Sequence, residues 1–432
     1  MEIKKQYYKR INETIYQAEH DSGLKIFVLP KKDFRKKHAY FMTKYGSIFN
    51  SFKNEKDEVI EKPFGIAHFL EHKIFEEDEG NIFEKFALLG ADVNAYTKFD
   101  STTYNFSTLD NFYESLELLV NFVQKPHITD ENVEKEKGII EQEIKMYLDN
   151  ADWKVYFNAL KAIYKKNGIR EDIAGSVESI QEITKDDLIE CYNYFYSPKN
   201  MIIFVIGDFD ENEVFTTIEK SLSEEFVMRK SLPNVVIEKE EESVNLKEIH
   251  EYMDVSQPKF IFGFKDVTKF SDEELFKRSL AIKIALISFF GASSKFYNDL
   301  YEEGLIDESF STEHSFSEYY HHTIFGGESD NPRELYKRVL DEINRIKKGG
   351  FSEENLIRTK RKFSGRYIAS FNSLQSVASL FTDYYIKGVN SFEYLDVLEE
   401  ISIGYIERVF KEHFNTDNSV ISIIESESEF DD

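Results

Sequence analysis

Cysteine is almost absent from this chain of 432 residues, which has a single one, Cys191. One thiol cannot form a disulfide within the chain, and it cannot build a metal site of several thiolates. A secreted domain held together by disulfides is therefore excluded, and a reducing compartment fits the composition better. Since a lone cysteine most often behaves as a small apolar residue, we expect Cys191 to be buried in a helix.

Basic residues are too few to balance the acidic ones. The chain has 54 lysines and arginines against 80 aspartates and glutamates, a formal net charge of −26 at pH 7. A nucleic-acid-binding protein needs a basic surface to neutralise phosphates, and attachment to an anionic membrane surface needs one too. With a sequence pI near 4.9, we expect neither a nucleic acid nor a membrane as a partner.

Long hydrophobic runs are also missing. The longest uninterrupted apolar run, Met201 to Ile206, has the length of a strand and cannot cross a bilayer. The basic N-terminal residues are followed by no apolar segment of the kind that forms a signal peptide. The glycine-rich phosphate loop, the dinucleotide-binding glycine pattern and the G-x-S-x-G turn of many serine hydrolases are absent. We therefore predict a soluble cytoplasmic protein without the usual markers of nucleotide or serine-hydrolase chemistry.

What the chain does contain is an internal repeat. Segments 183–206 and 401–424 share an amphipathic helical pattern, a short turn and an apolar strand, at a constant offset of 218 positions. A second match, 129–133 with 352–356, has an offset of 223. Apolar residues make up 41% of the chain and aromatic residues 15%, which is ample material for more than one core.

The repeat predicts an α+β protein of two homologous α/β halves, each with a largely antiparallel sheet flanked by helices. Strand-like and helix-like segments mix without the strict alternation that is typical of a parallel sheet. The predicted division is residues 1–215 for the first half, 216–250 for a charged linker and 251–432 for the second half.

One short helical segment carries the strongest chemical signal. In His68-Phe-Leu-Glu71-His72 the histidines are one turn apart, so they and Glu71 share one helix face, opposite an apolar face. Two such histidines can bind one zinc ion, and the carboxylate between them can hold and deprotonate a water on the metal. The alternative is a surface helix that carries two histidines and a glutamate by chance.

A downstream helix, residues 129–150, offers a further metal ligand. Its pattern turns Glu136 and Glu143 toward the apolar stripe and leaves Glu141 on the flank that faces water. Burying an unpaired carboxylate is costly, so glutamates that face inward need a cation nearby. A zinc ion on the first helix would supply it. The alternative is a boundary helix whose carboxylates reach solvent or pair with Lys137.

Together these segments resemble a known family. Three features are similar to the inverzincin zinc peptidases of the pitrilysin and mitochondrial-processing-peptidase family: His68-Phe-Leu-Glu71-His72, the glutamates Glu136 and Glu143, and Asn94-Ala-Tyr-Thr97 between them. Glu171-Asp-Ile-Ala-Gly-Ser176 and the repeated halves extend the resemblance over essentially the whole chain, and it is strongest to the bacterial YmfH branch. The resemblance implies two halves that face each other, or a partner, as a clamshell.

The resemblance also implies a role for each site residue. His68, His72 and Glu143 would bind one zinc ion per chain, and Glu71 would be the general base. Glu136 would be a supporting catalytic carboxylate that orients a metal ligand. The activated water would then attack a peptide carbonyl.

A substrate strand follows from the same resemblance. In the family, substrate lies extended along an edge strand near the metal. The matching segment here is 92–96, so Asn94, Ala95 and Tyr96 would contact a peptide that adds to the sheet as a further strand. Without the metal-binding motif nearby, these residues would be ordinary strand and turn positions.

The second half lacks the metal ligands. At the offset of 223, Thr359 and Arg366 stand where the first half has its two inward glutamates, so one zinc ion per chain is expected. Active relatives also carry an arginine–tyrosine pair that contacts the substrate backbone. The matching positions here are Tyr301 and Asp307. Either a partner supplies the pair or the activity is weak.

We therefore predict a zinc-dependent endopeptidase that cleaves extended or unfolded peptides. It would be the zinc-bearing subunit of a heterodimer, in which a homologous zinc-free subunit supplies the arginine–tyrosine pair. A homodimer or monomer that works without the pair is the second hypothesis. The third is a non-catalytic peptide-binding or scaffold subunit, and the intact H-x-x-E-H motif argues against it, because degenerate subunits of the family tend to lose these residues.

Overall fold

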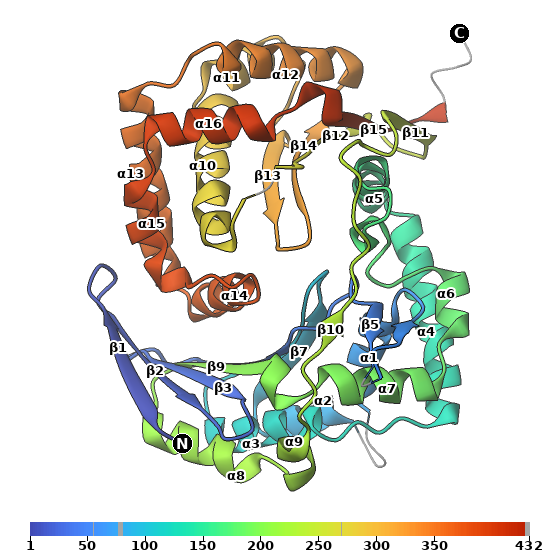
Figure 1. The fold of residues 1–432 in the computed structure, drawn as a ribbon, viewed down its shortest axis with the longest axis vertical. Helices are drawn as coiled ribbons and strands as arrows, with labels where there is room; N and C mark the ends of the chain where they lie inside the picture. Colours follow the sequence, from blue (N-terminus) through green and yellow to red (C-terminus); the bar gives the residue numbers. More distant parts are fainter. Residues whose placement is uncertain (55, 77–80, 269, 428–432) are drawn as a thin grey trace. The chain divides into compact units, whose positions relative to one another are not determined.

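The computed structural model describes residues 1–54, 56–76, 81–268 and 270–427 (Figure 1). The chain forms two compact units, each assembled from segments that are far apart in the sequence. Unit 1 comprises Met1–Ile144, Asp172–Ile237 and Ile368–Phe392, and unit 2 comprises Lys145–Glu171, Glu238–Tyr367 and Glu393–Asp432. These units do not coincide with the predicted linear division into 1–215, 216–250 and 251–432.

Two helices account for the exchange of segments between the halves, and the predicted linker 216–250 is divided between the units at Ile237. Helix α5 (Ala151–Ile163) comes from the first half of the sequence but packs on strands β12 (Lys259–Lys265) and β15 (Ser419–Glu425) of unit 2. Helix α14 (Leu374–Tyr385) comes from the second half but packs on strands β4 (Lys37–Thr43) and β9 (Met201–Gly207) of unit 1. The boundaries of the two units therefore depend on which sheet buries the apolar face of each helix. The composition along the chain does not show which sheet that is.

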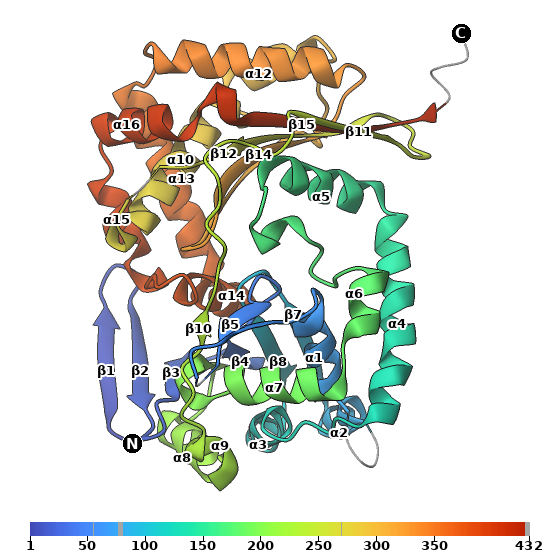
Figure 2. The ribbon, with the colours of Figure 1, turned by 45° about the vertical axis from the view of Figure 1, so that its right-hand side comes forward.

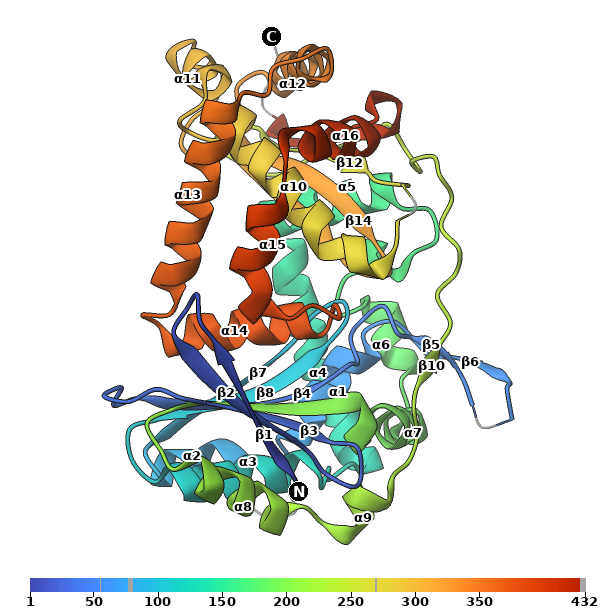
Figure 3. The same ribbon diagram turned by 60° about the vertical axis from the view of Figure 1, so that its left-hand side comes forward.

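Unit 1 is built on a seven-stranded sheet with the order β1-β2-β3-β9-β4-β8-β7. Neighbouring strands are antiparallel except β3 and β9, which are parallel. Helices α3 and α8 cover one face and α14 the other (Figure 3).

The remaining strands of unit 1 are β1 (Ile3–Tyr8), β2 (Glu13–Glu19), β3 (Lys25–Pro30), β7 (Ala91–Thr97) and β8 (Thr102–Thr108). A small separate sheet contains β10 (Asn234–Val235), β5 (Ser51–Lys53) and β6 (Val59–Glu61). The other helices of unit 1 are α1 (Ile66–Ile74), α2 (Ile82–Leu88), α3 (Phe112–Val123), α4 (Asp130–Leu148, whose last turn belongs to unit 2), α6 (Val177–Glu182), α7 (Lys185–Phe195), α8 (Glu211–Ser221) and α9 (Glu224–Met228), with a 3₁₀ turn η2 (Pro198–Asn200).

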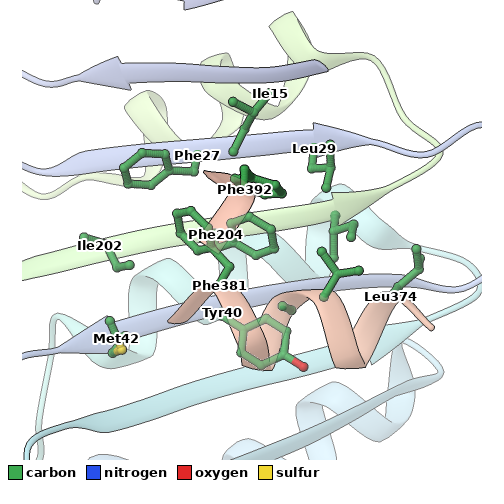
Figure 4. Close-up of a cluster of buried hydrophobic side chains, with 13 residues drawn as sticks. Ile15, Phe27, Leu29, Tyr40, Met42, Ile202, Phe204, Leu374, Phe381 and Phe392 are labelled. Atoms are coloured by element: carbon green, nitrogen blue, oxygen red, sulfur yellow. The ribbon is translucent and has the colours of Figure 1, made fainter. Parts of the chain in front are cut away.

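The apolar run of the sequence forms β9, in the middle of this sheet. Every residue of β9 is buried, because helices cover both of its faces. On the α14 side, the ring of Phe381 stacks on Phe204 with centroids 4.4 Å apart and lies 4.9 Å from the ring of Phe27 (Figure 4). Strand β9 is therefore apolar along its whole length. It does not alternate between polar and apolar residues, as a strand with one face in solvent does.

Unit 2 has a five-stranded sheet with the order β11-β15-β12-β14-β13. All pairs are antiparallel except β11 and β15. Helix α5 packs on one face and α12 on the other (Figure 2). Its other strands are β11 (Glu248–Tyr252), β13 (Ser311–Phe316) and β14 (His321–Glu328). Its other helices are α10 (Asp272–Phe290), α11 (Lys295–Glu302), α12 (Pro332–Lys347), α13 (Glu353–Ser370, whose last turn belongs to unit 1), α15 (Tyr394–Glu400) and α16 (Ile403–His413). The 3₁₀ turns η1 (Gly168–Arg170) and η4 (Thr416–Asn418) also lie in unit 2, and η3 (Ser391–Glu393) lies where one unit follows the other in the sequence.

The internal repeat is confirmed element by element. Helix α7, turn η2 and strand β9 recur as α16, η4 and β15, and the first and last residues of all three elements are shifted by the same 218 positions. Each helix also begins after a hydroxyl N-cap, Thr184 in one and Ser402 in the other. The prediction of an α+β fold with two largely antiparallel, helix-flanked sheets is confirmed.

Two smaller predictions concern burial and membrane contact. Cys191 lies buried in α7, as predicted, and burial raises the pKa of its thiol to about 12. Over the part of the chain that the structure describes, every helix is too short or too polar to cross a membrane.

Candidate metal centre

Helix α1 carries the H-x-x-E-H motif and begins at a very close backbone contact. Its N-cap, Gly65, has φ of 90°, and a Cβ atom there would lie 2.4 Å from the carbonyl oxygen of Ala174. Only glycine combines a left-handed conformation with this approach. The segment 171–176, which contributed to the family resemblance, therefore fixes the position at which the motif helix starts. The apolar face of the helix, Phe69 and Leu70 among others, is fully buried.

Three predicted ligands come together in unit 1. One ligand atom each from His68, His72 and Glu143 lies within 4.8 Å of the others. Nε2 of His68 is 3.7 Å from Oε1 of Glu143, and Nε2 of His72 is 3.7 Å from Oε2 of the same carboxylate. Two imidazole nitrogens and one carboxylate oxygen are a usual set of protein ligands for a catalytic zinc ion. Such a set leaves the fourth coordination position open for water or substrate.

The two histidines of the cluster differ in the direction of their pKa shifts. Burial and the neighbouring His72 lower the pKa of His68 to about 3, so its imidazole is neutral, as a metal ligand must be. Nδ1 of His68 is buried without a hydrogen-bond partner among the described residues. Burial alone would lower the pKa of His72, but its hydrogen bond to Glu136 and the surrounding carboxylates raise it. A site with several carboxylates in contact with histidines is favourable for a divalent cation.

Glu136 supports this cluster from the second turn of α4. Its Oε1 lies 3.0 Å from Nδ1 of His72, which directs the other ring nitrogen of His72 toward Glu143. Its Oε2 lies 3.7 Å from Nζ of the fully buried Lys73. Burial would raise the pKa of Glu136, but the hydrogen bond and charge of His72 and the charge of Lys73 lower it, so the carboxylate stays ionised.

The neighbouring charges on α4 lie elsewhere. Lys137 pairs with Glu134 at 2.7 Å, so it does not explain the inward position of Glu136. Glu141 is half-buried and lies outside the ligand cluster. Its Oε2 accepts a hydrogen bond of 3.5 Å from Nε2 of Gln181. The register predicted for this helix, with Glu143 rather than Glu141 toward the histidines, is the one that the structure has.

Glu71 shares the motif helix and is almost fully buried, with 8% of its surface exposed. Its Oε2 accepts a hydrogen bond of 2.6 Å from the hydroxyl of Thr97 at the end of strand β7. Burial raises the pKa of Glu71, and the hydrogen bond from Thr97 opposes that shift. A carboxylate with a raised pKa is a stronger base, so Glu71 is suited to take a proton near neutral pH.

A cavity opens beside the cluster. It has a volume of about 540 Å³, and its wall is formed by helices α1, α2 and α4 together with strand β7. Glu71, His72 and Glu136 belong both to its lining and to the site described above. Its lining also includes Phe75, Phe83, Asn94 and Ala95. The cavity is large enough for a single side chain next to the ligand cluster.

Strand β7 provides two of the three predicted substrate contacts on this cavity. Asn94 and Ala95 line it, and β7 is an edge strand whose only partner within the described sheet is β8. Tyr96 is not on the cavity wall. The ammonium group of Lys98 lies 5.1 Å from its ring centroid. The ring of Tyr96 is thus occupied by Lys98 away from the cavity, so only the backbone of Tyr96 would be available to a peptide beside β7.

The sequence predicted no role for Lys73, and none for Thr97 beyond its place in the segment Asn94-Ala-Tyr-Thr97 of the family resemblance. Both side chains lie against carboxylates of the site. Thr97 stands directly after the predicted substrate residues, and alternation along β7 places it on the face of Ala95. The position of Lys73 depends on its contact with the carbonyl of Asn132 at 3.0 Å, on another helix. No local pattern marks that contact.

The second-half counterparts are arranged as the repeat predicts. Thr359 is buried, with its hydroxyl 3.0 Å from that of Ser288, and Arg366 is exposed. Tyr301 is 48% exposed in α11, and the carboxylate of Asp307 accepts the backbone amide of Ser309 at 2.8 Å. Among the residues with described positions, the cluster in unit 1 is the one group that could hold a metal ion.

Comparison with known families decides the relationship. Residues 60–176 match the family model described as insulinase (peptidase family M16), and residues 182–363 match the one described as peptidase M16 inactive domain. The chain belongs to the M16 peptidase family. The first match contains all three predicted ligands and Glu71, whereas the second covers most of the half that lacks ligands.

Individual relatives of this M16 chain cover its whole length. A Bacillus subtilis protein called uncharacterized zinc protease YmfH is 38% identical over 97% of this chain and 98% of its own. A crystal structure described as an M16-like peptidase from Alicyclobacillus acidocaldarius has a TM-score of 0.92 at 33% identity, and covers 99% of both chains. A protease from Helicobacter pylori shares the fold with a TM-score of 0.78 at 20% identity, over 98% of this chain and 99% of its own. The predicted likeness to the YmfH branch is confirmed.

Proposed function

We propose that this M16 chain is a zinc-dependent endopeptidase that cleaves extended or unfolded peptides. The observation that carries the proposal is the convergence of His68, His72 and Glu143, with Glu71 on the same helix face as the two histidines. Each group in that set has a separate use in metal-assisted hydrolysis of a peptide bond. The family membership and the names of the relatives support the same chemistry.

Each residue has a defined task in this proposal. His68, His72 and Glu143 would hold the zinc ion, which when bound polarises a water molecule and a peptide carbonyl. Glu71 takes the proton of the attacking water and passes it to the leaving amine. Glu136 holds the ring of His72 in the orientation that presents Nε2 to the site.

The substrate is proposed to bind as an added strand along β7. The edge of β7 offers backbone groups at Asn94, Ala95 and Tyr96, and the cavity of about 540 Å³ accepts one side chain beside the cluster. Backbone pairing is independent of sequence and requires an extended chain. Unfolded segments therefore fit this binding mode better than folded proteins.

We also propose that the chain works with a homologous zinc-free subunit in the cytoplasm, with a homodimer as the alternative assembly. Tyr301 and Asp307 stand where active relatives carry the arginine–tyrosine pair, so the pair would come from the partner. The buried free thiol of Cys191 agrees with a reducing compartment. A non-catalytic peptide-binding subunit is the second candidate function, because 182–363 match the inactive-domain model.

Partner dependence predicts a specific assay result. The purified chain alone should bind zinc yet cleave unstructured peptides slowly, and addition of a homologue that carries the arginine–tyrosine pair should restore turnover. Peptide hydrolysis is measured for each chain and for the mixture, with the Glu71→Gln variant as the control for contaminating proteases. Fast hydrolysis by the single chain, abolished by Glu71→Gln, would replace this proposal with a self-sufficient peptidase. A zinc-free chain that binds peptides would favour the non-catalytic subunit.

A further inference from the structure

Thr97 is the polar side chain in direct contact with the proposed base that has no task in the scheme above. It ends strand β7, and its Oγ1 lies 2.6 Å from Oε2 of Glu71. This length is typical of a hydroxyl group that donates to an ionised carboxylate. The contact joins the strand proposed to bind substrate to the base on helix α1.

Counting protons fixes the direction of this hydrogen bond. A threonine hydroxyl has one proton to donate. Thr102 lies opposite Thr97 in the β7–β8 pair, and its hydroxyl lies 2.8 Å from the carbonyl oxygen of Tyr45, which can only accept. The proton of Thr102 is therefore committed to Tyr45. Thr97 then has two acceptors within reach, Thr102 at 3.3 Å and the charged oxygen of Glu71 at 2.6 Å, and the nearer charged oxygen takes its proton.

The support under Thr97 is rigid. Thr102 and Tyr45 are fully buried, and the ring of Tyr45 stacks on Phe195 with centroids 4.0 Å apart. Thr97 thus holds the base through its hydroxyl, on a strand whose pairing partner Thr102 is packed among buried neighbours.

We propose that Thr97 is a positioning residue for Glu71. By holding Oε2, it restricts the rotation of the carboxylate and leaves Oε1 to meet the attacking water. Because Thr97 continues the strand along which peptide would lie, the same side chain sets the base at a constant distance from the bound substrate. This inference rests on the proposed function, in which Glu71 is the base.

Three substitutions of threonines, two at Thr97 and one at a control position, test this role. Thr97→Val keeps the shape and removes the hydroxyl, so kcat should fall roughly 10–100-fold with KM and zinc content unchanged. Thr97→Ser keeps the hydroxyl and should retain most of the activity. Thr108→Val is the matched control, since Thr108 is a buried threonine at the opposite end of the same strand pair and its hydroxyl contacts only backbone carbonyls. It should leave kcat near the unsubstituted value.

The double variant separates positioning from general damage. If Thr97 acts through Glu71, Thr97→Val should cause no further loss in a chain that already carries Glu71→Gln. Full activity of Thr97→Val, or an equal additional loss in the double variant, would overturn the inference. These results are distinct from failure of the proposed function, which would show as full activity of Glu71→Gln itself.

A structural readout does not depend on activity. In a crystal structure of the metal-free Thr97→Val chain, the Glu71 carboxylate should leave its present position beside β7. The Thr108→Val chain should keep it. An unchanged Glu71 in the Thr97→Val structure would also overturn the inference, whatever the assay shows.

Discussion

Glu71→Gln should leave zinc in place and reduce peptide hydrolysis by about 10²–10⁴-fold, the usual contribution of a general base. The amide has the shape of the carboxylate and can still accept the hydrogen bond of 2.6 Å from Thr97. It cannot take a proton from water. The loss should therefore appear in kcat, measured with an unstructured peptide at full zinc loading.

Metal analysis of the same preparation is the necessary control. Glu71 lies outside the three-residue ligand cluster, so its replacement should not change the zinc content. A zinc-loaded Glu71→Gln chain with nearly full activity would show that another group is the base. Loss of zinc together with activity would instead place Glu71 among the ligands.

Glu143→Gln should impair zinc retention severely, because it removes the one carboxylate ligand of the cluster. The loss of affinity should exceed the roughly 10–100-fold loss expected for Glu136→Gln, whose carboxylate acts through His72. Zinc affinity is measured by competition with a chelator, on variants whose folding is checked by circular dichroism.

Glu141→Gln is the matched control on the same helix. Glu141 has the same chemistry two residues away, but it contacts Gln181 and not the histidines. Its replacement should change zinc affinity little. If Glu141→Gln were the damaging change and Glu143→Gln the silent one, the ligand helix would have to be rotated from the orientation described here.

Helical periodicity predicted which side chains of each helix turn inward, and the family resemblance implied which of them would bind a metal ion. The one-turn spacing of His68 and His72 defines a helix face, and the apolar stripe of α4 distinguishes Glu143 from Glu141. Both depend on residues within a few turns of each other, where helical geometry leaves little freedom. The repeat was equally visible, because α7 and α16 retain the same caps, turns and following strands.

Contacts between distant segments that neither the helical pattern nor the resemblance indicated were not predicted. Glu71 meets Thr97 only because α1 packs beside β7, and no spacing in the sequence encodes that distance. The same holds for the units. Helices α5 and α14 are amphipathic segments like many others, and the sheet that each one covers is decided by tertiary packing.

Zinc stoichiometry of the purified chain is the most direct test of the metal centre. We expect one zinc ion per chain in the unsubstituted protein and in His20→Ala, a control at a histidine whose ring is hydrogen-bonded to Ser22 outside the ligand cluster. We expect no retained zinc in His68→Ala or His72→Ala, which keep only two of the three protein ligands. An unsubstituted chain that binds no zinc, or a His68→Ala or His72→Ala chain that keeps one ion, would contradict the assignment of these ligands.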